Sequence, residues 1–321
     1  MQNTKDFEQP CQRTDIATEC VELAYKNSRP DSDGIISSHE DISGIICDTV
    51  EITKDEGANK LQKPKGKYIT LDVGKIWNYS KEDFEIAVEV CAHKLAELLP
   101  AGNKKGGCLL ACLGNRQITA DSQGPMCADH FIVTRHIKDS SPKIFSELGL
   151  FETMCITPDV LGNTGIEAAL TIKGVVEKTK PDFVIAVDSL ASRKTSRLAT
   201  TLQMSNAGIT PGSGVGNHRT ALSAETLGVP VISIGIPTVV DAVTVGADIL
   251  EEYFSKCDKQ TISPSILKDI LDSVLESGSY GYFVTPKNAD EISKAAARLI
   301  GMTINKALNP ELSCNDIEDL L

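Results

Sequence analysis

Short apolar runs alternate along this chain with amphipathic segments of helical length. Runs at 108–113, 183–187 and 229–236 are almost continuously apolar, and each ends in a turn of small or polar residues. Such runs are typical of strands buried on both faces, as in parallel sheets covered by helices. The pattern therefore predicts an α/β fold, with a largely parallel sheet covered by helices on both faces.

The helical segments carry their own start and stop signals. Segment 81–98 has apolar residues at helical spacing, with Ser80 as the expected cap and Pro100 as the expected stop. Thr164 and Glu167 form a sequence capping box that predicts a helix continuing to about Lys180. Further helices are expected near 128–137, 242–253, 264–276 and 288–308, and further strands at 42–52, 67–73 and 152–157.

Composition limits the classes of function. The chain has 321 residues, 41% of them apolar, and a formal net charge of -12, which argues against broad affinity for nucleic acid or anionic membranes. No apolar stretch approaches the ~20 residues that span a bilayer, and the first residues lack a signal-peptide core. A cytoplasmic protein is expected. Several of the ten cysteines lie in apolar runs, which is typical of reduced core residues.

Two aspartates follow the apolar runs and are the main candidates for chemistry. Asp121 lies in a turn of small residues after run 108–113, and Asp188 directly follows run 183–187. Parallel strands end at a common edge, where ligands bind in open α/β sheets. Two acids converging there can share a proton and activate water without a metal. Each aspartate also has a structural interpretation, as a turn residue or a helix cap.

Other polar segments give weaker signals. Asp241 and Asp72 also follow strands and are expected to be structural. Segment 211–219 is rich in glycine but matches neither G-x-G-x-x-G nor a P-loop, so we interpret it as an ordered loop near the substrate cleft.

Metal and nucleophile motifs are not found in the sequence. The five histidines form no H-E-x-x-H motif, and there is no C-x-x-C pair and no G-x-S-x-G elbow. No cofactor or metal is expected. A metal bound by Asp121, Asp129 and His130, which are close in sequence, stays open as an alternative.

The motifs at the strand ends resemble those of a known family. Segments 113–125, 161–167, 187–193, 208–217 and 234–242 are similar, in this order, to signatures of the germination protease of spore-forming bacteria. The matches span about 13 to 245. Ser122-Gln123 and Asn206-Ala207 depart from the family pattern, and we expect these departures to affect substrate fit more than chemistry.

The resemblance implies an endopeptidase that degrades small acid-soluble spore proteins during germination. It implies an aspartic-type mechanism in which Asp121 and Asp188 are catalytic, on a fold similar to that of hydrogenase-maturation endopeptidases. It further implies a homotetramer without a cofactor, located in the cytoplasm of the forespore or spore core.

The resemblance also implies a zymogen that removes its own amino-terminal propeptide. Family substrates are cut before Ile/Phe-Ala-Ser-Glu preceded by an acid, and residues 15–19, Asp-Ile-Ala-Thr-Glu, are similar. We therefore expect cleavage between Asp15 and Ile16, with 1–15 as propeptide and 16–321 as the endopeptidase domain. The alternative is that Thr14 or Asp15 simply caps a helix.

Three other functions remain open from the sequence. The first is a metal-dependent peptidase related to hydrogenase-maturation endopeptidases, and the second is a nickel-sensing maturation peptidase, for which His218 is the histidine closest to a matched loop. The third is a non-catalytic binding module that uses segment 211–219.

Overall fold

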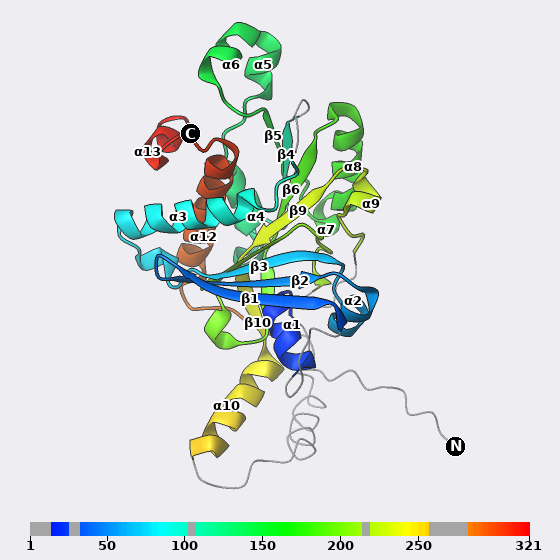
Figure 1. Ribbon diagram of the computed structural model, residues 1–321, viewed down its shortest axis with the longest axis vertical. Coiled ribbons are helices and arrows are strands. Elements are labelled where there is room, and N and C mark those ends of the chain that lie inside the picture. Colours follow the sequence, from blue (N-terminus) through cyan, green and yellow to red (C-terminus); the bar gives the residue numbers. More distant parts are fainter. Residues whose placement is uncertain (1–13, 26–32, 102–106, 214–218, 257–281) are drawn as a thin grey trace, which may run out of the picture.

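A mixed sheet forms the centre of the fold. The computed structural model describes residues 14–25, 33–101, 107–213, 219–256 and 282–321. Within these ranges, eight strands form one sheet in the order β1-β2-β3-β8-β9-β6-β4-β5 (Figure 1). Their bounds are β1 Ile35–Ile42, β2 Ile45–Ile52, β3 Gly66–Asp72, β4 Cys108–Cys112, β5 Thr153–Ile156, β6 Phe183–Val187, β8 Thr201–Ser205 and β9 Val231–Gly235.

The sheet has a parallel half and an antiparallel half. Strands β5, β4, β6 and β9 are parallel to one another, whereas β8 pairs antiparallel with β9 and the ladder continues antiparallel through β3, β2 and β1. All residues of β4, β6 and β9 are buried, which explains their continuous apolar sequences.

Helices cover both faces of the parallel half, as the sequence predicts. On one face Leu110 and Ile185 pack with α3 (Lys81–Ala96) and α12 (Ala289–Leu308). On the other face Leu109 and Val184 pack with α8 (Ala168–Thr179) and α9 (Ala224–Leu227), and Figure 1 shows these helix pairs on opposite sides. The expected α/β fold with two helical layers is confirmed.

The helix signals are confirmed at α3 and wrong at α8. Ser80 Oγ accepts a hydrogen bond from Asp83 N (3.1 Å) to form a capping box, and α3 begins at Lys81. Thr164 instead ends the short helix α7 (Leu161–Thr164), because Gly165 adopts a left-handed φ of 73°. Helix α8 therefore begins at Ala168 without a side-chain cap.

Several other elements differ from their expected form. The strand expected at 42–52 is part of the β1–β2 hairpin, and the helix expected at 128–137 is a 3-10 turn followed by α5 (Arg135–Ser140). The helix expected at 264–276 lies outside the described residues. A second sheet, β11 (Phe283–Val284), β10 (Pro237–Asp241) and β7 (Leu190–Ser192), was not expected.

The remaining α-helices in the described ranges are α1 (Ala17–Ala24), α2 (Asp55–Leu61), α4 (Gln123–Cys127), α6 (Pro142–Leu148), α10 (Ala242–Lys256) and α13 (Cys314–Asp319).

The cysteines and helices fit the compositional expectations. Most of the cysteines in the described ranges are buried in the core. Among the helices described here, none has the length and apolar character needed to cross a bilayer.

The close approach of α4 to the sheet gives a test of the fold. A Cβ on Gly124 would lie 2.1 Å from Leu113 O and 2.8 Å from Val187 O, so the Gly124→Ala side chain would push backbone atoms apart. We expect this substitution to lower the free energy of unfolding by roughly 1–3 kcal/mol in denaturant titration. The control is Gly174→Ala in α8, where a Cβ meets nothing within 4 Å. This control should raise the stability by roughly 0.5–1 kcal/mol; equal effects of the two substitutions would contradict the packing argument.

Candidate active site

Asp188 is held rigidly where β6 leaves the sheet. Its backbone N–H donates to Ile234 O (3.2 Å), and its Oδ1 accepts a hydrogen bond from Ser189 N (3.0 Å). Its residue surface is 6% exposed. A Cβ on Gly235 would lie 2.1 Å from Asp188 O, so β9 can pass this close only with glycine at that position. Asp188 is followed by β7 and does not cap a helix.

Asp121 lies in a turn that folds back onto the end of β4, the neighbour of β6. Its Oδ2 accepts a hydrogen bond from Asn115 N (2.8 Å). Gly114 has a φ of 110° and lies close to the backbone of Asp121, because a Cβ on Gly114 would lie 2.1 Å from Asp121 O. Thr238 Oγ1 donates to Ala120 O (2.6 Å) and fixes the turn to β10. The carboxylate is therefore placed by backbone contacts.

Gln123 joins the Asp121 turn to the end of β9. Its side chain is buried, its Oε1 accepts from Ile236 N (2.9 Å), and its Nε2 donates to Ile236 O (3.4 Å). Ser122 is also buried, and its hydroxyl donates to Thr119 O. Both side chains bond within the protein, and the expected effect of Ser122-Gln123 on substrate fit stays a prediction.

The pKa values of both carboxyl groups are raised, and the charge of Asp121 contributes to the rise at Asp188. Burial raises the pKa of Asp188 well above its ordinary value of 3.8, and the nearby charges of Asp121 and Asp15 raise it further. Burial also raises the pKa of Asp121, while the Asn115 N–H and the charge of Arg219 act in the opposite direction. The structure thus brings the two predicted aspartates together at one edge of the sheet, with Asp188 the more buried.

The segment 14–19 lies beside this pair of acids. Asp15 N donates to Ala191 O (2.9 Å), and Ala191 N donates to Asp15 Oδ2 (2.9 Å), so Asp15 pairs with the free edge of β7. Ser213 Oγ donates to Asp15 Oδ1 (2.8 Å). Ile16, the next residue, is fully buried. The sequence predicts cleavage at this same Asp15–Ile16 bond.

A glutamine that the sequence analysis missed spans this bond. Gln203 Nε2 donates to Asp15 O (2.7 Å), and Ala17 N donates to Gln203 Oε1 (2.7 Å). Gln203 lies in β8, a strand that was not predicted from its sequence, Thr-Leu-Gln-Met-Ser. A glutamine flanked by two core residues was the signal available.

Glu19 occupies a closed carboxylate site. It is 1% exposed, and its oxygens accept hydrogen bonds from Arg193 N (2.7 Å) and Lys194 N (2.8 Å), directly after β7. The Thr14 hydroxyl also donates to this carboxylate, and Arg197 Nη1 lies 3.5 Å from it. Helix α1 begins at Ala17 and its N-cap residue is Ile16, so the capping interpretation of Thr14 or Asp15 is wrong.

The weaker candidates separate into structural and peripheral groups. Asp72 accepts a hydrogen bond from Gly74 N in a turn, and the exposed Asp129 pairs with Arg116 (2.8 Å). Asp241 is buried at the end of β10, directly before α10. In the part of the chain that the structure describes, no group of three or more His, Cys, Asp or Glu residues could hold a metal ion.

Segment 211–219 is described only in part. Its Ser213 contacts Asp15, and the charge of Arg219 acts on both aspartates, so the described residues lie near the candidate site as expected. Residues 214–218, including His218, lie outside the described residues.

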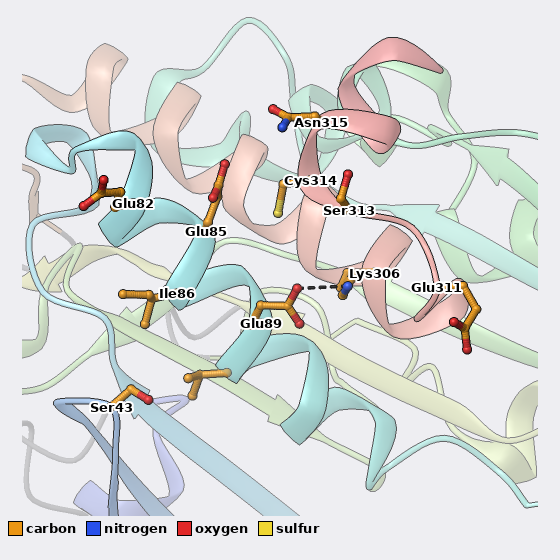
Figure 2. A pocket seen from close by; sticks show the side chains of 11 residues that line it. Ser43, Glu82, Glu85, Ile86, Glu89, Lys306, Glu311, Ser313, Cys314 and Asn315 are labelled. Atoms are coloured by element: carbon orange, nitrogen blue, oxygen red, sulfur yellow. Dashed lines mark ion pairs between the residues drawn. The ribbon is translucent and has the colours of Figure 1, made fainter.

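A large cavity of about 690 Å³ lies elsewhere, between α3 and the C-terminal helices (Figure 2). Glu82, Glu85 and Glu89 line it from α3, and Lys306 from α12 pairs with Glu89 (2.9 Å). Neither Asp121 nor Asp188 lines this cavity, and it is separate from the candidate active site.

Comparison with known proteins points to one family. A sequence model of the family described as germination protease matches residues 12–265. The germination protease of Caldanaerobacter subterraneus is 38% identical over 96% of this chain and 98% of its own length, and that of Clostridium perfringens is 37% identical with the same coverage. The germination protease of Priestia megaterium is 39% identical over 87% of this chain and 77% of its own length.

A solved structure gives a weaker similarity. The [NiFe] hydrogenase maturation protease of Thermococcus kodakarensis aligns with a TM-score of 0.34 and 15% identity, covering 66% of this chain and 98% of that one. The expected relation to hydrogenase-maturation endopeptidases stays a prediction at this score.

The buried acid gives a prediction about stability and pH. Because its native pKa is raised, Asp188 keeps a proton that the unfolded chain releases above the ordinary pKa of 3.8. The native state then binds more protons than the unfolded state, so Asp188 costs stability as the pH rises. Asp188→Asn, which never ionises, should therefore unfold at higher denaturant than the parent near pH 7. The difference in free energy of unfolding between the two proteins should shrink as the pH falls toward about 4.

The matched control is Asp129→Asn, which removes only an exposed ion pair worth about 0–1 kcal/mol. The difference in free energy of unfolding between Asp129→Asn and the parent should change little with pH. An Asp188→Asn difference that stays constant between about pH 4 and about pH 7 would contradict the raised pKa.

Proposed function

The chain belongs to the germination protease family, and on this basis we propose that it is an endopeptidase that starts the degradation of small acid-soluble spore proteins during germination. Membership of the family is the basis for the proposed reaction. Because this reaction belongs to spore germination, we place the protein in the spore core. The observation that carries the mechanism is the binding of segment 14–19 beside Asp121 and Asp188.

Segment 14–19 supports a self-processing zymogen. Asp15 donates one backbone hydrogen bond to the edge of β7, and the Gln203 side chain of β8 bonds to the backbone on both sides of Ile16. Peptides that bind along a strand edge are also held through their backbone groups. In this proposal Asp15–Ile16 is the bond cut, 1–15 is the propeptide and 16–321 is the enzyme. External substrates bind by the same contacts, with an acid before the bond and a glutamate at the position of Glu19.

The unequal environments of the two acids suggest their roles. Asp188, the more buried group, is the protonated acid, and Asp121 is the ionised base. Asp121 takes a proton from water as the water oxygen attacks the Asp15 carbonyl carbon, and Asp188 gives its proton to the carbonyl oxygen. The tetrahedral intermediate returns that proton to Asp188 as its C–N bond breaks, and Asp121 protonates the leaving nitrogen of Ile16.

The proposal also includes the homotetramer that the resemblance implies. Sedimentation of the purified chain measures its mass in solution directly, and a monomer under all conditions would remove this part of the proposal.

The aspartate pair is tested by removing one carboxylate at a time. Asp121→Asn and Asp188→Asn should each lower the rate of Asp15–Ile16 cleavage by at least about 10²-fold, because each loses one proton-transfer group. The product is followed by mass spectrometry of a chain that begins at Ile16. Asp72→Asn, at another strand end, is the matched control and should cleave like the parent. Parent-like cleavage by either site variant would refute the pair.

Chelation separates this mechanism from the metal-dependent alternative. In the proposed mechanism the two aspartates transfer the protons and no metal takes part. The protein should therefore cleave a peptide containing Asp-Ile-Ala-Thr-Glu at the same rate before and after exhaustive treatment with chelators. Loss of activity that returns on adding one divalent metal would favour the metallopeptidase.

A further inference from the structure

The Gln203 side chain contacts the Asp15–Ile16 peptide group and the peptide group that follows it, Ile16–Ala17. Its Nε2 donates to Asp15 O and its Oε1 accepts from Ala17 N, each at 2.7 Å. A backbone N–H needs an acceptor and a carbonyl needs a donor, so these two partners fix which way the amide points. The carbonyl it contacts belongs to the bond proposed to be cut.

We propose that Gln203 is a catalytic residue that holds the scissile peptide in register and donates a hydrogen bond to its carbonyl oxygen. This inference rests on the proposed function, in which Asp15–Ile16 is the substrate bond. As water attacks, negative charge develops on the Asp15 oxygen, and a donor already aimed at this oxygen stabilises the transition state more than the ground state.

The position of Gln203 suits this role because it is rigid. In β8 it pairs with Thr70 of β3 on one side and with Gly235 of β9 on the other. Its neighbours Leu202 and Met204 belong to the core on the opposite face of the sheet. A donor fixed by two strands needs no rearrangement when the carbonyl becomes an oxyanion.

Gln203 also lies close to the acid pair. Gly235, its partner in the β8–β9 ladder, is the residue whose added Cβ would contact Asp188 O. Gln203 in β8 and Asp188 at the end of β6 therefore lie on either side of β9, with Gln203 bonded to the Asp15 carbonyl and the charge of Asp15 acting on Asp188. Asp188 supplies the proton, and the Gln203 amide shares the charge that forms before that proton arrives.

Burial indicates that Gln203 serves a bound peptide. Gln203 is 7% exposed, and burying an amide without hydrogen bonds is costly. Both hydrogen bonds of its side chain go to segment 14–19. A buried glutamine needed only for folding would bond to the sheet, as Gln123 does with Ile236.

The test uses parent and variant chains that have been incubated until self-processing is complete, with a peptide containing Asp-Ile-Ala-Thr-Glu as the substrate. Gln203→Met keeps the shape but removes both polar atoms, so kcat should fall by about 10²–10³-fold, with a smaller change in KM. The control is Thr70→Val on the adjacent strand, whose buried hydroxyl has no hydrogen-bond partner; it should match the parent. Denaturant unfolding checks that each variant folds.

Gln203→Glu gives an independent measurement. Its ionised carboxylate can accept from the substrate N–H but cannot donate to the carbonyl, whereas its protonated form can do both. The ratio of variant to parent kcat should therefore rise as the pH falls. A ratio that does not change with pH, or a Gln203→Met variant that keeps the parent kcat, would overturn the inference while leaving the proposed function intact. A parent chain that cuts neither Asp15–Ile16 nor the peptide would overturn both.

Discussion

Close backbone contact at one edge of the sheet is the constraint on which the candidate site depends. Gly114, Gly124 and Gly235 each sit where a Cβ would lie 2.1 Å from a backbone oxygen. These contacts press the Asp121 turn against β4 and β6 and bring β9 against Asp188. Burying two carboxyl groups side by side is unfavourable and raises the pKa of Asp188, so the energy that holds them together comes from the packing of the surrounding backbone and core.

The same edge also provides the peptide-binding surface. The chain passes from β6 through Asp188 into β7. Asp188, whose pKa is raised, therefore lies only a few residues from the strand edge that pairs with Asp15. The turn after β7 then offers the N–H groups that bind Glu19. One continuous segment thus combines an acid, a strand edge that bonds to Asp15 and a carboxylate site, which fixes the distance between them.

The sequence predicted those parts of the fold that local patterns determine. Buried strands such as β4 and β6 were predicted because a strand buried on both faces is a continuous apolar run in the sequence. The start of α3 was predicted because Ser80 is a preferred helix cap. The α8 capping box failed because Gly165 ends a separate turn first. Gln203 was missed because its partners lie almost two hundred residues earlier in the chain, and no local pattern encodes such a contact.

The complete burial of Ile16 has a consequence for the fate of the reaction products. Hydrolysis would turn its amide into an ammonium group on a fully buried residue, and would leave a second carboxylate on Asp15 beside Asp121 and Asp188. Unpaired charge in a buried site is strongly unfavourable, and so is a crowd of like charges. The cut would thereby weaken the binding of both new chain ends, so that they can leave the cleft without any separate opening device.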